Sequence, residues 1–73
     1  MRAYRIIRHH TDAPTEVVAT RPAKRAALAE AAELRAKDHL HHYAVWETRR
    51  RGNCQEVRQI WSSALAELAK GMT

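Results

Sequence analysis

A helix-like segment that spans residues 23–37 separates strand-like segments, and this arrangement most constrains the fold. The segment consists largely of Ala, Leu, Glu, Lys and Arg, the residues with the highest helix propensities. Pro22 suits the first turn of such a helix, and Ala27, Ala31 and Leu34 share one face. The sequence therefore predicts one long helix with strands before and after it.

The predicted strands are short segments with apolar positions that lack helical spacing. Residues 3–9, 16–20 and 41–48 have this pattern and contain β-branched or aromatic residues. Residues 10–15 are rich in turn formers and predict a hairpin loop. The first two strands should form an antiparallel hairpin, and the helix should return the third strand to the same sheet.

The segment that follows the third strand predicts a second helix over residues 54–70. Asn53 and Glu56 have the spacing of a capping box, and the apolar residues after them recur at helical spacing. Gly71 is a natural C-cap for such a helix.

An alternative for this segment begins with a hairpin turn at Gly52 and Asn53. Residues 55–61 would then form a fourth strand, and a shorter helix would begin near Ser62. We favour the longer helix because the apolar period fits 3.6 residues better than 2.

The expected fold is a single α+β domain over residues 1–73 with the element order β-β-α-β-α. If the third strand pairs on the free side of the first, the chain forms a three-stranded antiparallel sheet of order 2-1-3 with two helices. A right-handed connection is the usual choice for such a crossover. A chain of this size buries only about 60% of its unfolded surface, so its stability should be marginal.

The composition also indicates where such a chain resides. Its single cysteine excludes an internal disulfide and fits a reducing cytoplasm. No apolar run is long enough to span a membrane, and the first residues lack the apolar core of a signal peptide. We therefore expect a cytoplasmic protein without a membrane partner.

Three consecutive arginines follow the third strand, in a chain with a formal net charge of +5. In the expected topology, strand ends and both helix starts converge at this pole. Arginine forks bind phosphate and carboxylate groups, and helix N-termini attract anions. The alternative is that these arginines pair with Glu16, Glu47 and Glu56. The candidate anion-binding residues are Arg2, Arg21, Arg25, Arg49, Arg50 and Arg51.

The five histidines suggest a metal site, which the expected topology then argues against. His9 and His10 should approach His41 and His42 at the end of the sheet opposite the arginines. Zinc sites use imidazole nitrogens, but adjacent residues of a strand point to opposite faces. At most one of each pair can serve one site, so we expect no metal and no cofactor. Without an evident catalytic arrangement, we expect a protein that is not an enzyme.

Both faces of the expected sheet carry apolar residues, and one helix cannot cover both. Either the two helices sandwich the sheet, or one face is buried in a homodimer or against a protein partner. The candidate interface residues are Ile7, Tyr43 and Trp46, since aromatic anchors are enriched at binding hot spots.

The layout of residues 4–8, 16–20, 26–38 and 42–47 resembles that of small uncharacterised proteins of high-GC actinobacteria and their bacteriophages. The likeness covers residues 3–47 and is mainly compositional. It carries no catalytic motif and implies a small accessory protein without a defined activity.

These features predict a small binding module that engages nucleic acid or an acidic protein surface through its arginines. No zinc-finger spacing, aromatic-rich RNA-binding signature or clear helix-turn-helix is present, so binding should depend little on nucleotide sequence. The alternative is a protein-interaction factor that binds a host target or itself through the apolar sheet face and Trp46.

Overall fold

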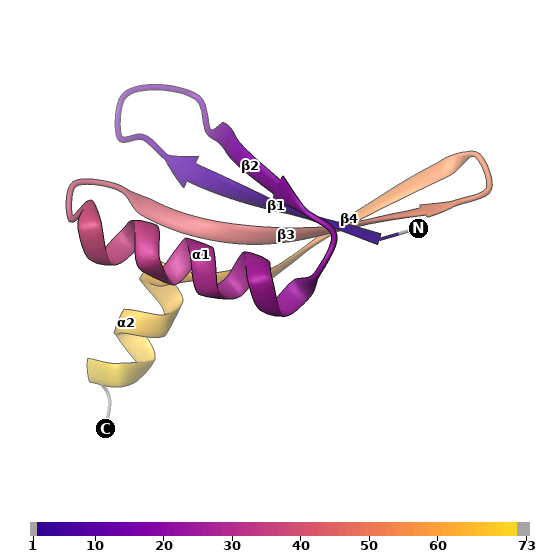
Figure 1. The fold of residues 1–73 in the computed structure, drawn as a ribbon. Helices are drawn as coiled ribbons and strands as arrows, with labels where there is room; N and C mark the ends of the chain where they lie inside the picture. The colour runs from indigo at the N-terminus through magenta and orange to yellow at the C-terminus, as the bar shows by residue number, and fades with distance from the viewer. Residues whose placement is uncertain (1, 72–73) are drawn as a thin grey trace.

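The computed structural model describes residues 2–71, which form four strands and two helices (Figure 1). All neighbouring strands are antiparallel, and their order is β2-β1-β3-β4. The predicted α+β class and the order of the first three strands are confirmed, whereas the expected three-stranded sheet is wrong. The elements are β1 (Arg2–His9), β2 (Glu16–Arg21), α1 (Lys24–Lys37), β3 (His42–Arg51), β4 (Cys54–Ser62) and α2 (Ser63–Gly71).

The fourth strand replaces most of the second helix that the sequence predicted over residues 54–70. Gly52 has a φ of 58° and Asn53 has a negative φ, which fits a two-residue type II′ hairpin turn. Arg51 and Cys54 pair directly across this turn. The hairpin prevails because β4 then completes a ladder along β3, which outweighs the capping-box pattern at its start. The alternative interpretation, with a strand followed by a short helix, is therefore confirmed.

Helix α1 lies on one face of the sheet, which we call the helix face (Figure 1). Ala27 and Ala31 are fully buried there, and their small side chains let the helix approach the strands closely. They pack in one cluster with buried residues from the two central strands, and Leu28 and Leu34 flank the contact. The buried strand residues of this cluster are Tyr4, Ile6, Tyr43 and Val45.

The opposite side of the sheet, which we call the open face, has no helix packed over it within residues 2–71. Ile7 and Ala44 are buried on this face by their neighbours and lie outside the α1 cluster. Every described side chain of α2 after Ser63 is exposed, and the helix extends from the β4 end of the sheet below α1 (Figure 1). The two helices therefore do not sandwich the sheet.

Polar contacts at Ser63 and Glu67 connect α2 to β3 and α1. The buried Ser63 Oγ accepts a 2.9 Å hydrogen bond from the Tyr43 backbone N–H and lies 2.8 Å from His42 Nδ1. Arg35 of α1 binds both carboxylate oxygens of Glu67 at 2.8 and 3.1 Å. No helix among the described residues is long and apolar enough to cross a membrane.

Replacing Gly52 with alanine should destabilise the protein by about 1 kcal/mol or more, because only glycine adopts this positive φ without strain. No atom lies within 4 Å of the position of an added Cβ, so the loss would come from the backbone conformation alone. Urea unfolding followed by circular dichroism would measure it. The control, Asn53→Ala, should change stability by less than about 0.5 kcal/mol. Equal stability of the two variants would contradict the turn assignment.

Candidate nucleic-acid interface

The β3–β4 hairpin extends beyond the rest of the sheet (Figure 1). Arg2, where β1 begins, pairs with Arg49, so residues 50–55 form a ribbon of only two strands. Arg50 and Arg51 are exposed in this ribbon and have no ion-pair or hydrogen-bond partner within the described part of the chain. The sequence-predicted arginine run is thus a projecting hairpin tip, which we call the arginine hairpin (residues 49–56).

Strand alternation divides the arginine run between the two faces of the sheet. Arg49 and Arg51 lie on the helix face, whereas Arg50 lies on the open face. The three charges were expected to lie together at one pole of the sheet. In the structure, two of the three charges lie on the helix face and the third lies on the open face.

A cavity of about 340 Å³ on the helix face contains both signs of charge. Glu47 lies 3.7 Å from Arg58, and its side chain is only 13% exposed. Glu56 pairs directly across from Arg49. Within residues 2–71, the ion pair of this cavity therefore joins Glu47 to Arg58, which is not one of the candidate arginines. Among the same residues, Arg2 and Arg49 have no ion pair with either glutamate of the cavity. Its lining residues are Arg2, Glu47, Arg49, Glu56 and Arg58.

The two remaining candidate arginines differ from each other. Arg21 is engaged within the chain, since it donates to Glu30 Oε1 at 2.8 Å and to the Thr20 carbonyl at 2.9 Å. Arg25 is exposed in the first turn of α1, where the helix N-terminus adds positive potential. The expected convergence of two helix starts at this pole is wrong, because α2 begins at Ser63, beside His42 at the other end of β3.

The three candidate interface residues do not form a common surface. Tyr43 is fully buried on the helix face, and Ile7 is buried on the open face. Trp46 lies on the open face, where it is half-buried and donates its indole N–H to Gln59 Oε1 at 3.2 Å. Only Trp46 therefore remains as an accessible aromatic side chain of the original set.

The histidines converge at the opposite end of the sheet, as the topology predicted. His9 pairs with His42 across the two central strands, and the rings of His10 and His41 lie 4.8 Å apart, edge to face. Within residues 2–71 no group of three potential ligands is close enough together to hold a metal ion.

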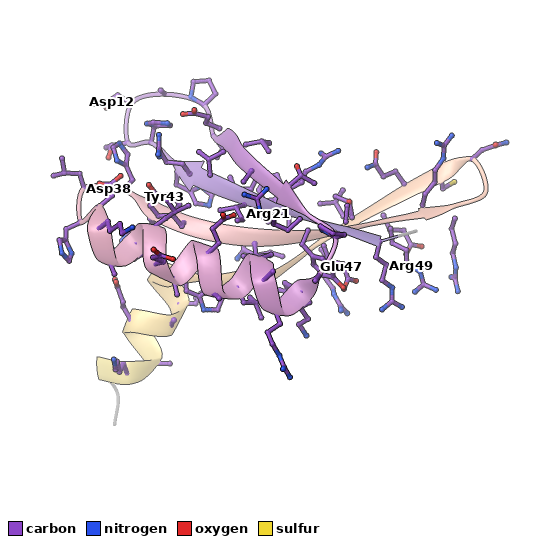
Figure 2. All side chains as sticks on the ribbon, viewed as in Figure 1. Asp12, Arg21, Asp38, Tyr43, Glu47 and Arg49 are labelled. Atoms are coloured by element: carbon purple, nitrogen blue, oxygen red, sulfur yellow. The ribbon has the colours of Figure 1, made fainter. Side chains whose placement is uncertain are left out.

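A network of hydrogen bonds joins α1, β1 and β3 at this histidine end. The buried Tyr43 hydroxyl donates to Asp38 Oδ2 at 2.9 Å and accepts from Arg8 Nε at 3.0 Å. His41 Nδ1 lies 2.8 Å from the same Asp38 oxygen, and Arg8 also lies 3.7 Å from Glu16. Figure 2 shows Asp38 and Tyr43 side by side at the end of α1. The network closes the junction between the helix and the sheet.

The charge of Asp38 is strongly favoured in this network. The hydrogen bond from His41 is the largest cause, and the bonds from the Tyr43 hydroxyl and the Leu40 backbone N–H add to it. Together they lower the pKa of Asp38 from 3.8 to about 2. Asp38 and Arg8 were missed from the sequence, although the spacing of Asp38 and His41 just after the helix was visible. Glu16 was named only as a possible partner of the candidate arginines.

Comparison with protein-family models, curated proteins and solved structures finds no significant match to this chain.

The network predicts a loss of stability in acid. The folded-state pKa of Asp38 lies below the ordinary value of 3.8, so its contribution is complete above about pH 4 and is lost as the pH falls towards 2. The variant Asp38→Asn should be less stable at neutral pH and should show a flatter stability curve over this range. Urea midpoints measured from pH 2 to pH 6 would show the difference.

Two comparisons make this measurement specific. The pKa of Glu67 is also lowered, chiefly by its hydrogen bonds with Arg35, and this contribution persists in the Asp38→Asn variant. Asp12→Asn removes the same charge from an exposed loop residue and serves as the control. Parallel acid curves for the wild type and Asp38→Asn would contradict the role given to this carboxylate.

Proposed function

We propose that the protein is a small non-enzymatic module that binds nucleic acid through the arginine hairpin. The observation that carries this proposal is that Arg50 and Arg51 are exposed at a projecting tip and have no carboxylate partner among the described residues. Guanidinium groups in such positions are available for phosphate oxygens. The net charge of +5 would speed the encounter with a polyanion.

Phosphate contacts of this kind position a protein on nucleic acid without selecting a sequence. Arg25 and the N-terminus of α1 lie at the same end of the molecule as the hairpin and would add to its positive potential (Figure 1). The proposed binding is therefore sensitive to salt and tolerant of sequence.

Neutralising the tip should weaken binding without affecting the fold. The variant Arg50→Gln/Arg51→Gln removes two exposed charges, and the slope of log affinity against log salt should fall by about one to two units. Fluorescence anisotropy with labelled DNA and RNA of mixed sequence, between about 50 and 200 mM salt, would measure this. Circular dichroism would verify that the variant is folded.

The control variant, Lys37→Gln/Lys70→Gln, makes the same change in net charge away from the hairpin. Lys37 ends α1 at the opposite end of the molecule, and Lys70 lies in α2. If both double variants lose affinity equally, binding depends on net charge alone and the hairpin is not the site. Absence of binding by the wild type, or binding that salt does not weaken, would overturn the proposal.

A second candidate function is self-association through α2, which a groove beside this helix favours. A cavity of about 320 Å³ lies between β4 and α2 and is lined in part by Ile60, Trp61 and Leu65. Leu65 and Leu68 are 60% and 62% exposed. Gln59 and Ser62 also line this cavity, so each copy of the chain carries a groove of mixed polar and apolar lining together with exposed leucines that would fill the groove of a second copy.

Light scattering of the purified protein would test this second candidate. A dimer that dissociates in the variant Leu65→Gln/Leu68→Gln would support it. The control is Leu40→Gln, which alters a leucine that is 87% exposed and lies outside the groove. A wild type that remains monomeric at high concentration would exclude it.

A further inference from the structure

The two faces of the sheet differ in their carboxylates. The strands contain three carboxylates, Glu16, Glu47 and Glu56, and strand pairing places all of them on the helix face. Glu16 pairs with Arg8, and the other two line the cavity beside the arginine hairpin. None of the described strand residues therefore places a carboxylate on the open face.

The open face is cationic as a result. Arg5 and Arg50 project from it, and neither has an ion-pair or hydrogen-bond partner within residues 2–71. On the helix face, by contrast, Arg8, Arg21 and Arg58 each lie within ion-pair distance of a glutamate. Asp12 lies in the loop between β1 and β2, at the end of the molecule away from the hairpin (Figure 2). Arg2, Arg49 and Arg51 on the helix face also have no ion pair within residues 2–71, so the open face is distinguished by its lack of strand carboxylates.

Trp46 lies at the centre of this face, on one of the two inner strands. It pairs with Arg5 on β1 and with Gln59 on β4, so it has a cation on one side and an amide on the other. Its hydrogen bond to Gln59 Oε1 fixes the orientation of the indole. Arg50 lies on the same face, four residues farther along β3, which corresponds to about 13 Å.

We propose that the open face binds single-stranded nucleic acid, with a base stacked on Trp46 and with Arg5 and Arg50 on the backbone phosphates. This inference rests on the proposed function and names its ligand class. It adds to the arginine hairpin a surface that contacts bases as well as phosphates. Arg50 belongs to both the open face and the arginine hairpin, so a single strand of nucleic acid would continue from the sheet onto the hairpin.

The arrangement suits an unpaired strand better than a duplex. Bases in a duplex are stacked on one another, whereas unpaired bases are free to stack on aromatic side chains. A sheet face that carries an aromatic residue beside one arginine, with a second arginine farther along the same strand, supplies a stacking surface and an electrostatic track together. Since every base has a π-face, such binding tolerates many sequences.

The test compares a labelled twelve-nucleotide oligothymidylate with a DNA duplex of the same length, by fluorescence anisotropy at fixed salt. The wild type should bind the single strand more tightly. Trp46→Leu should lose about tenfold in affinity for the single strand. Trp46→Phe, which keeps an aromatic face, should retain most of the affinity. Single-strand binding should also quench the intrinsic fluorescence of the wild type, and Trp46→Phe should lose most of this quenching.

A matched pair of arginine variants separates the two faces. Arg5→Gln should weaken single-strand binding several-fold, whereas Arg58→Gln should leave it nearly unchanged, because Arg58 lies on the helix face beside Glu47. Both variants remove one charge from a strand, and circular dichroism would verify their folding.

The outcomes distinguish this inference from the proposed function. If single strand and duplex bind equally and Trp46→Leu binds like the wild type, the inference is overturned while the arginine hairpin stands. If Arg58→Gln weakens binding as much as Arg5→Gln does, the open face is not the surface involved. If the wild type binds neither the single strand nor the duplex, the proposed function and this inference both fail.

Discussion

The antiparallel pairing of β1 with β3 is the constraint on which the rest of the structure depends. It extends from Arg2 and Arg49 at one end to His9 and His42 at the other. Between these ends it aligns Ile6 with Val45, the two residues that form the centre of the surface beneath α1. The same ladder leaves Arg50 and Arg51 beyond the start of β1, so it sets the length of the projecting hairpin. The register of β1 against β3 therefore positions the core, the arginine hairpin and the histidine end of the sheet together.

Much of the fold could be predicted from local patterns and one rule of chain connection. The composition of residues 23–37 was sufficient to predict α1. A crossover to the free side of β1 predicted the order of the first three strands. Residues 54–70 could not be assigned in the same way. Their start is polar and has the spacing of a helix cap, and the gain that makes it a strand comes from backbone pairing with β3. That gain depends on β3, whose residues lie outside the segment in which the local pattern was examined.

The candidate site was predictable in position but not in detail. The sequence located the arginine run and the histidine end correctly at opposite poles of the sheet. It did not reveal that Arg49 and Arg50 project to opposite faces, because the run was placed after the end of the third strand. The network around Asp38 was equally hidden, since Arg8 and Tyr43 meet only through strand pairing. Side-chain partners of this kind require the register to be known.

The polar start of β4 made this strand hard to predict from the sequence. It also affects how β4 behaves as an edge strand of the sheet. An edge strand offers unpaired backbone groups, and long apolar edges promote aggregation. Between Cys54 and Gln59 only Val57 is a large apolar residue, and Glu56 and Arg58 place opposite charges beside it. The irregular pairing near Trp46 and Gln59 further interrupts the ladder of this strand. Strand β4 therefore carries its own protection against edge-to-edge association, in a sheet that has one face without a helix.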